Sequence, residues 1–298
     1  MSFETLVQLE AYLPEISQCE SKLGKTLSYA LSTQGSLSRA RLAYSVASEL
    51  DLSERHRVSL AAAIEFFHIA SLLFDDLPCM DDADTRRGDV CVHRIHGESS
   101  TILAALALIN RAYFLMYRAF AAADPIAAEE ANNLADECLG LAGIINGQAL
   151  DLNFGQTDQS AEVVRLVAVQ KTGALFRLCL LLPAILGRAS RYEKMHLARL
   201  AELWGLAYQS ADDLKDVLLS EGNAGKTVRQ DEEKGRPNLA LKLGVREATA
   251  ELDRTMRAAS CSVLALSSSY PRKWLGVSLF QKEFLAKVEP LLSSEAVA

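Results

Sequence analysis

The sequence contains little proline, little glycine and few aromatic residues for its length. Its 298 residues include 7 Pro and 16 Gly, and aromatic side chains make up 7% of the chain, while 50% of the residues are hydrophobic. Short, turn-rich strands need more proline, glycine and aromatic residues, and a disordered chain is far less hydrophobic. The composition therefore excludes an all-β protein and a disordered one, and it predicts an all-α fold with a sizeable core.

Signals for nucleic-acid binding, export and thiolate metal sites are also missing. The net charge is −7 and no block of basic residues is present, which argues against a nucleic-acid partner. The N-terminal stretch shows no basic region followed by an apolar one, and the longest uncharged run is shorter than the roughly 20 residues that span a bilayer. We therefore expect a cytoplasmic protein with no membrane span. The 6 cysteines show no CxxC pair, which predicts reduced thiols.

Apolar residues recur at spacings of three and four along most of the chain, and short polar breaks such as residues 86–89 separate these stretches. This periodicity is typical of successive helices. No glycine-rich phosphate-binding loop and no repeat period is present, so nucleotide-binding α/β folds and helical solenoids lose support. The sequence predicts one continuous α-helical domain over residues 1–298, with a mobile loop at residues 221–237.

Two acidic clusters interrupt this apolar pattern, each at the end of a helical stretch. Residues 75–82 read DDLPCMDD and residues 212–216 read DDLKD. Asp212 and Asp216 are four residues apart, so on a helix their carboxylates share a face, which is costly unless a cation offsets their repulsion. Oxygen ligands of this kind suit Mg²⁺, which binds a few carboxylates together with substrate phosphates. The clusters predict a metal site for a phosphorylated substrate, with solvated helix ends as the alternative.

Basic residues that could complete such a site follow in the sequence. Arg86 and Arg87 come directly after the first cluster. Lys171 opens an apolar helix together with Thr172, and Lys226 lies in the glycine-containing loop. Carboxylates, a metal and these cations together describe a clamp for a diphosphate group.

Four motifs occur in the order and with the spacing of a known enzyme family. They are FHIASLLFDDLPCMDDADTRRG ending at Gly88, GQALDL from Gly147, KTG from Lys171, and QSADDLKD from Gln209. With these motifs the chain resembles the trans-isoprenyl diphosphate synthases over nearly its whole length. The resemblance implies an all-α fold of antiparallel helices around a deep central cavity. It also implies a homodimer, with the two aspartate motifs facing each other across the mouth of that cavity.

The resemblance further implies a role for each matched residue. Mg²⁺ ions, about three with substrate bound, would draw charge onto an allylic diphosphate until its carbon–oxygen bond ionises. Thr172 and Gln209 would lie beside the developing allyl cation, where oxygen dipoles stabilise positive charge. The implied metal ligands are Asp75, Asp76, Asp81, Asp212 and Asp216. The implied ligands of the allylic diphosphate are Arg86, Lys171 and Lys226.

Isopentenyl diphosphate, the second substrate of this family, needs a cationic pocket without metal, and here the chain departs from the family pattern. Where the family reads Gly-Gly-Lys-Arg-x-Arg, the chain reads QGSLSR, so Ser36 replaces the lysine and only Arg39 remains. His68 and Arg87, the other expected ligands, are present. Losing one charge-assisted contact of about 1.5–3 kcal/mol would weaken binding by about one to two powers of ten, unless another cation such as Arg41 substitutes.

Product length would depend on the residues that precede Asp75 on the same helix and point towards the growing tail. Ser71 and Ala70 lie about one turn before it, and Phe67 lies about 12 Å away at 1.5 Å per residue. The small residues would not stop a C15 chain, which predicts geranylgeranyl diphosphate (C20). Phe67 could instead act as the floor, which keeps farnesyl diphosphate (C15) as an alternative.

Three activities are compatible with these motifs. The leading hypothesis is Mg²⁺-dependent condensation of isopentenyl diphosphate with dimethylallyl, geranyl or farnesyl diphosphate. The second is an allylic-diphosphate lyase or terpene cyclase that no longer uses isopentenyl diphosphate, which the loss of the lysine at Ser36 favours. The third is a non-catalytic partner subunit, which the two intact acidic motifs disfavour because such clusters are costly to keep.

Overall fold

The structure is a computed structural model that describes residues 20–33, 35–156, 158–222 and 234–292. It divides into two compact units, one that ends at Glu129 and one that begins at Glu130. Each unit is built from helices, which confirms the all-α prediction, and the strands among the described residues are two of 2 residues each. The prediction of a single domain around one deep cavity concerns both units together and stays a prediction.

The first unit contains five helices and one short antiparallel ribbon in the part that the structure describes. Its helices are α1 (Lys22–Ser32), α2 (Ser38–Glu49), α3 (Glu54–Asp75), α4 (Val92–His96) and α5 (Glu98–Phe120). The ribbon pairs β1 (Thr85–Arg86) with β2 (Asp89–Val90), where the sequence predicted only a polar break. Arg87 and Gly88 form its turn, with φ angles of 58° and 93°, a left-handed pair that matches the twist of a two-residue hairpin.

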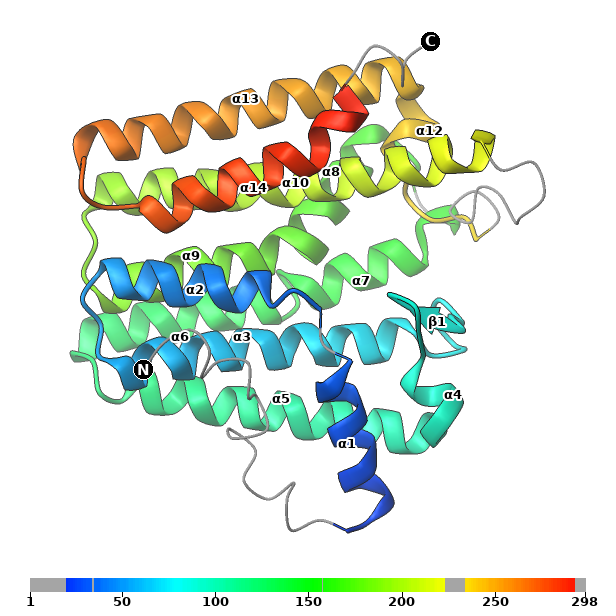
Figure 1. Ribbon diagram of the computed structural model, residues 1–298, viewed down its shortest axis with the longest axis horizontal. Coiled ribbons are helices and arrows are strands. Elements are labelled where there is room, and N and C mark those ends of the chain that lie inside the picture. Colours follow the sequence, from blue (N-terminus) through cyan, green and yellow to red (C-terminus); the bar gives the residue numbers. More distant parts are fainter. Residues whose placement is uncertain (1–19, 34, 157, 223–233, 293–298) are drawn as a thin grey trace. The chain divides into compact units, whose positions relative to one another are not determined.

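Helix α3 is the central element of the first unit and packs against α2 and α5, which lie on either side of it in Figure 1. Residues 60–64, with sequence LAAAI, have no exposed surface, because this stretch is apolar on every face. The three alanines let the neighbouring helices approach closely. The first acidic motif therefore stands at the end of a helix whose middle is fixed by burial on all sides.

The second unit is arranged around α10, its longest described helix, which packs against α9, α12 and α13 (Figure 1). In the described part of this unit, five elements precede α9 in the chain. They are α6 (Pro125–Leu139), which contains the boundary between the units, α7 (Ile144–Leu152), the 3-10 turn η4 (Phe154–Gln156), α8 (Ala161–Val167) and the π-helical turn η5 (Ala168–Gly173). The remaining helices are α9 (Ala174–Leu186), α10 (Arg191–Gly222), α12 (Leu239–Leu243), α13 (Val245–Ser269) and α14 (Leu275–Leu292).

Aromatic side chains fill the core of the second unit. Phe176, Trp204 and Phe280 contact one another, with ring centroids 4.6 to 6.0 Å apart. Trp204 has no exposed surface, and its Nε1 donates to Oε1 of Gln281 over 2.6 Å, so the buried indole N–H is satisfied. This packing holds α9, α10 and α14 together around the helix that carries the second acidic motif.

Three helical stretches are long and apolar enough to cross a membrane by length and composition: Glu54–Asp75, Glu98–Phe120 and Ala161–Leu186. A search for uninterrupted uncharged runs misses them, because each contains a few charged residues. In the first and third, 72% of the most apolar window is buried inside the protein, but in the second only 39% is. The expectation of a cytoplasmic protein with no membrane span stays a prediction.

The cysteines that the structure describes are free thiols, as their spacing predicted. Cys79 and Cys261 are exposed, and the buried ones are Cys91, Cys138 and Cys179. Burial raises the pKa of Cys138 to about 12, so this thiol stays protonated and behaves as a small hydrophobic side chain. The fold is therefore held by helix packing without disulfides in this part of the chain.

Candidate active site

The first acidic motif forms a tight turn at the carboxyl end of α3. The backbone N–H of Asp81 donates to the carbonyl of Asp75 over 2.9 Å, and that of Ala83 donates to the carbonyl of Asp76 over 3.2 Å. The chain therefore turns back on itself between these residues. The turn brings Asp75 and Asp81, both partly exposed, to the same place, which is the arrangement that two ligands of one metal site require.

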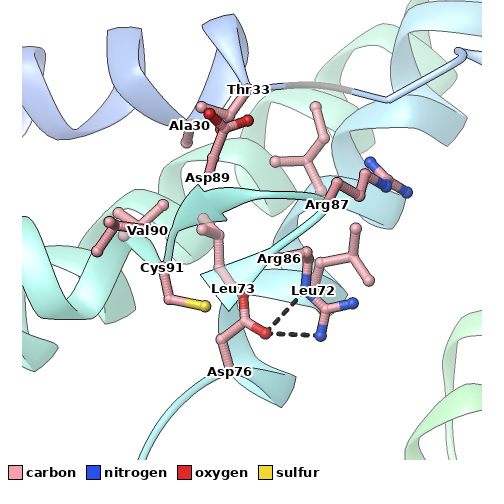
Figure 2. Close-up of a pocket in the computed structure, with 12 residues that line it drawn as sticks. Ala30, Thr33, Leu72, Leu73, Asp76, Arg86, Arg87, Asp89, Val90 and Cys91 are labelled. Atoms are coloured by element: carbon pink, nitrogen blue, oxygen red, sulfur yellow. Dashed lines mark hydrogen bonds and ion pairs between the residues drawn. The ribbon is translucent and has the colours of Figure 1, made fainter. Parts of the chain in front are cut away.

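Asp76 differs from its neighbour because it is buried, with 4% of its surface exposed. Arg86 of β1 donates from Nε and Nη2 to its Oδ1 over 2.8 and 2.6 Å (Figure 2). The thiol of Cys91 also hydrogen-bonds to this carboxylate. Burial, and then the Asp76 carboxylate, raise the pKa of Cys91 to about 11, so the thiol stays protonated and can donate. Asp76 thus holds the β1–β2 hairpin against the end of α3.

The consecutive residues Arg86 and Arg87 point away from each other (Figure 2). Arg86 faces Asp76, whereas the guanidinium of Arg87 lies against Gly35. The approach is so close that a side chain on Gly35 would push the guanidinium of Arg87 aside, so this glycine lets Arg87 occupy its present position. Two arginines that look alike in the sequence therefore serve different parts of the site.

Arg39, His68 and Arg87 form a cationic group in the first unit, which we call the acceptor cluster. Arg39 Nη1 lies 3.2 Å from His68 Nε2, and each of these two residues is 8% exposed. Burial and the positive charges of three nearby arginines hold the pKa of His68 well below its usual 6.5. The imidazole is therefore neutral, accepts the Arg39 N–H at Nε2 and carries its proton on Nδ1. The structure brings these three predicted ligands together. Their net positive charge suits an anion that is bound without a metal ion.

Glu65 lies next to the acceptor cluster, and sequence reasoning missed it. Its side chain is 2% exposed, and its Oε2 accepts the backbone N–H of Ala40 over 3.4 Å. Its pKa lies above the usual value, because burial outweighs the opposing charges of Arg39 and Arg87. The signal that could have revealed it is a lone carboxylate on an apolar helical stretch, three positions before His68.

In the second unit, Asp151 gathers two basic side chains. Lys171 Nζ donates to its Oδ2 over 2.8 Å, and Arg236 Nη1 lies 3.6 Å from the same oxygen. The side chain of Arg236 is only 8% exposed, which shows that this arginine belongs to a built site and not to the surface. Sequence reasoning missed Arg236; the signal was a basic residue directly before Pro237, where the glycine-containing stretch ends.

Lys171 and Thr172 lie in η5, a π-helical turn that leads into α9. Such single turns often occur at functional sites. Two glycines let its neighbours come close: a Cβ on Gly147 would lie 2.5 Å from Lys171 N, and one on Gly205 would lie 2.5 Å from Gly173 Cα. Gly147 of α7 and Gly205 of α10 therefore fix the position of this turn. The prediction that Lys171 opens an apolar helix is wrong, because the chain is already helical from Ala161 and Lys171 lies in the π turn between α8 and α9.

A chain of hydrogen bonds links Thr172 to the second acidic motif. Thr172 Oγ1 donates to Gln209 Oε1 over 3.4 Å, and Gln209 Nε2 donates to Asp213 Oδ1 over 2.9 Å. Asp213 is 1% exposed and also accepts the backbone N–H of Leu239 over 2.7 Å. Because the carboxylate takes the amide N–H, the carbonyl oxygen of Gln209 is turned towards Thr172. The two predicted oxygen dipoles, Thr172 and Gln209, are thus adjacent in the structure.

Asp212 and Asp216 lie one turn apart on α10, as their spacing predicted. The side chain of Asp212 is 47% exposed and accepts from Lys215 Nζ over 3.0 Å. Oδ2 of Asp216 is buried and has no hydrogen-bond partner among the described residues. A buried carboxylate oxygen without a partner is costly, which fits a site that a cation completes. Lys226, the remaining predicted diphosphate ligand, lies outside the described residues.

The donor set suits Mg²⁺ and does not form a closed protein cage. Within the described ranges, no three His, Cys, Asp or Glu side chains converge closely enough to hold a metal alone. Mg²⁺ tolerates this, because it keeps water molecules and takes phosphate oxygens of the substrate as ligands. The partly exposed carboxylates with this chemistry are Asp75 and Asp81 in the first unit, and Asp212 and Asp216 in the second.

The residues predicted to control product length lie on consecutive turns of α3. Ala70 is buried, and Ser71 Oγ donates to the backbone carbonyl of His68 over 2.8 Å. Phe67 meets Tyr113 of α5 edge to face, with ring centroids 5.0 Å apart. Phe67 and Tyr113 therefore form an aromatic pair, of which the sequence indicated only the first member.

An all-α fold with one aspartate motif at the end of α3 and another on α10, together with clustered lysine and arginine side chains, is the architecture of the isoprenoid synthases. The family model described as "Polyprenyl synthetase" matches residues 20–263. The chain belongs to this family.

Individual proteins agree with this assignment. The chain is 34% identical over 213 residues to Geranylgeranyl pyrophosphate synthase 7, chloroplastic, of Arabidopsis thaliana, a match that spans 70% of this chain and 61% of that protein. It is 28% identical over 263 residues to Farnesyl diphosphate synthase of Bacillus subtilis, with 87% and 88% covered. A crystal structure of geranyltransferase from Helicobacter pylori, complexed with magnesium and isoprenyl diphosphate, has the same fold, with a TM-score of 0.74 at 24% identity over 98% of both chains.

Proposed function

We propose that the protein condenses isopentenyl diphosphate head to tail with an allylic diphosphate in an Mg²⁺-dependent reaction, and that its product is geranylgeranyl diphosphate. The observation that carries this proposal is the acceptor cluster, whose positive charge suits a diphosphate bound without metal. An enzyme that only ionised an allylic diphosphate would have no use for such a cluster. The two named relatives are synthases of this reaction class, which supports the proposal.

Ionisation of the allylic diphosphate would fall to the residues around the two acidic motifs. Bound Mg²⁺, about three ions, supplies Lewis-acid stabilisation of the departing diphosphate. The carboxylates that would hold it are Asp75, Asp81, Asp212 and Asp216, whereas Asp76, which the motif also implies, is buried and bound to Arg86. Lys171 and Arg236, both oriented by Asp151, would bind the diphosphate oxygens. Arg86 and Lys226 complete the proposed set of cations for the leaving group.

The allyl cation that remains would be stabilised by oxygen dipoles. Thr172 Oγ1 and Gln209 Oε1 are 3.4 Å apart, and Asp213 fixes the orientation of the Gln209 amide. Because these groups are in place before the charge develops, no reorganisation is needed at the moment of reaction. The departing diphosphate would then take the final proton, so the proposal needs no histidine or glutamate base.

The acceptor cluster would bind isopentenyl diphosphate through the guanidinium groups of Arg39 and Arg87. Neutral His68 and buried Glu65 would help to position Arg39. Ser36 is exposed, so the position of the missing lysine is open to solvent. Ser36→Lys should lower the KM for isopentenyl diphosphate by about tenfold and leave kcat unchanged, because the added cation acts on substrate binding.

Product length follows from the helix α3 residues. Ala70 and Ser71 leave the first turn below Asp75 without bulk, and the Phe67–Tyr113 pair lies further down the helix. Small residues next to Asp75 and bulky ones further away favour a C20 product. If the Phe67–Tyr113 pair stops the growing chain at C15, the product is farnesyl diphosphate. Removing the ring with Phe67→Ala should lengthen the product, whereas Ala70→Phe should shorten it to C15 or less, as read by mass spectrometry.

We also propose that the enzyme is a cytoplasmic homodimer in which residues 1–298 act as one catalytic domain. Helix α5 leaves several large apolar side chains in contact with solvent, an arrangement that is costly in water and typical of interfaces. They are Leu103, Leu106 and Phe114. Light scattering should give the mass of two 32.5 kDa chains, and a monomer would contradict the homodimer.

The experiment that tests the function is a mass-spectrometric product profile from purified protein with Mg²⁺, isopentenyl diphosphate, and dimethylallyl, geranyl or farnesyl diphosphate in turn. A C20 diphosphate supports the proposal, and a product that stops at C15 places the floor at Phe67 and Tyr113. Release of diphosphate without chain extension would favour the second candidate, an allylic-diphosphate lyase, which the loss of the lysine at Ser36 favours. Asp75→Asn is the control that should yield neither outcome.

A further inference from the structure

A pocket of about 350 Å³ lies at the opposite end of α3 from the acidic motif. It is formed by the first turns of α3, the last turn of α5 and the residues that follow α5. Its polar lining consists of Arg55, His56, Ser59, Tyr117 and Arg118. At 1.5 Å per helical residue, Arg55 stands about 30 Å from Asp75, so the pocket is separate from the sites described above.

The pocket brings together hydrogen-bond donors that the described part of the protein does not use. Neither Arg55 nor Arg118 forms an ion pair with a carboxylate of the described residues. The guanidinium carbon of Arg118 lies over the face of Phe114, 5.6 Å from the ring centroid. The hydroxyl groups of Ser59 and Tyr117 likewise have no hydrogen-bond partner within the described ranges. Four side chains that carry hydrogen-bond donors therefore line one cavity, and none of the four has an acceptor among the described residues.

Another arginine at the start of α3 does find partners within the protein. Arg57 donates from Nε to the carbonyl of Leu52 over 2.6 Å and also pairs with Glu54, 3.8 Å away. A surface arginine on this helix thus finds internal partners where they are within reach. The guanidinium of Arg55 instead stands beside the pocket, where no carboxylate is among the lining residues.

His56 and the start of α3 add to the positive character of the pocket. His56 Nδ1 lies 2.6 Å from Ser53 Oγ. When Ser53 donates this hydrogen bond, the ring proton is on Nε2, which becomes a further donor. Ser53 makes no side-chain hydrogen bond to a backbone N–H of α3, so the N–H groups of the first turn are not capped by its side chain, and Glu54 in this turn pairs with Arg57. All these features favour an anion.

We propose that this pocket binds a diphosphate group at a second site, outside the catalytic centre. Two guanidinium forks with hydroxyl donors match the many oxygens of a diphosphate, and the alanines at 119, 121 and 122 leave room for it. The volume lies in the range of small-molecule pockets. Two ligands share this chemistry, inorganic diphosphate and a prenyl diphosphate, and this choice of ligands rests on the proposed function.

Modification of individual arginines with phenylglyoxal, read by peptide mass spectrometry, tests the proposal on the full chain without Mg²⁺ and without turnover. Inorganic diphosphate and geranylgeranyl diphosphate are added in separate arms. With ligand at ten times its Kd, modification of Arg55 and Arg118 should slow by about tenfold, because only about one site in eleven stays empty. Arg246, which is exposed and equally unpaired among the described residues, is the control that should not slow.

Ala122→Glu and Ala122→Gln form a matched pair of variants. Ala122 is exposed and follows the end of α5, so neither change disturbs the core. The carboxylate should occupy the pocket and remove the protection, whereas the uncharged amide of the same size should retain it. Protection by inorganic diphosphate shows that the diphosphate group is sufficient, and protection by the prenyl diphosphate alone identifies the organic ligand. No slowing in either arm, or slowing that survives Ala122→Glu, overturns the proposal whatever the outcome of the condensation assay.

Discussion

Asp76 and Asp213 are each the second of two consecutive aspartates, and both are buried, yet different parts of the chain hold them. Asp76 accepts from Arg86, which follows 10 positions later on the adjoining hairpin. Asp213 accepts from Gln209, 4 positions earlier on the same helix, and from Leu239, 26 positions later at the start of α12. Their preceding neighbours, Asp75 and Asp212, remain at least partly exposed.

The difference shows that the two motifs depend on the fold to different degrees. The first is completed by residues that follow at once in the chain, so its geometry is local. The second is completed only when the chain returns at Leu239, and through Gln209 it also sets the position of Thr172. In both motifs, however, the exposed aspartate is available for a metal and the buried one positions its surroundings. The comparison therefore predicts that removing the exposed carboxylate of each pair affects activity, whereas removing the buried one affects stability.

The largest expected effect falls on the activity of variants of the exposed members. Asp75→Ala and Asp212→Ala should each lower kcat by about 10²–10³-fold, because a carboxylate that would hold Mg²⁺ is removed. Their free energies of unfolding should change by less than about 0.5 kcal/mol, since both side chains reach solvent. Steady-state assays and urea unfolding measure the two quantities. A loss of stability as large as that of the buried members would break the comparison.

The next largest effect is the loss of stability on removing the buried members. Asp213→Ala should lower the free energy of unfolding by about 2–4 kcal/mol, because the Gln209 amide and the Leu239 N–H lose their acceptor in a buried place. Asp76→Ala should cost about 1–3 kcal/mol, less because the Arg86 side chain is 34% exposed and can turn to water. Urea unfolding followed by circular dichroism gives both values, and the reverse order would show that the hairpin matters more than α12.

A smaller effect tests whether the second unit depends on the close backbone contact between Gly147 and η5. Gly147→Ala should lower the free energy of unfolding by about 1–3 kcal/mol, because the new Cβ would meet the backbone of Lys171. It should also raise the KM for the allylic substrate by displacing Lys171. Gly155→Ala is the matched control, since its Cβ would make only ordinary contacts at 3.6 Å. Equal stability of the two variants would mean that η5 can move away without cost.

The smallest expected effect is a pH dependence that belongs to the first unit. His68 has a folded pKa below 6.5, so as pH falls through 6.5 the unfolded chain binds a proton that the folded chain does not, and stability drops. Between pH 7.5 and pH 5.5 the wild type should lose about 1.4 kcal/mol more than His68→Gln. Glu65, whose pKa is raised, acts in the opposite direction but is present in both proteins and largely cancels. Thermal unfolding at the two pH values measures the difference, and identical slopes would show that His68 is charged in the folded state.

Much of the fold and the site followed from the sequence because their signals are local. Apolar spacing predicted helices, and the first acidic motif lies at the end of one, as expected. The second motif lies inside α10, which continues to Gly222, so the expectation that it ends a helical stretch is wrong. The separate roles of Asp75 and Asp76 were not predictable, because one residue step on a helix turns the side chain by about 100°, and only the packed structure shows which direction is buried. Arg236 and Tyr113 were missed for a related reason: their partners, Asp151 and Phe67, are distant in the chain.

Helix α3 connects three features at fixed distances: the acidic motif at one end, the Phe67 ring in between and the arginine-lined pocket at the other end. Because its middle is buried on all sides, inserting or deleting one residue would rotate everything beyond that point by about 100° and shift it by about 1.5 Å. Such a change would separate Asp75 from its turn or Phe67 from Tyr113. If the enzyme has the proposed function, exchanging side chains along α3 should therefore alter product size, whereas changing the length of the helix should disrupt the site itself.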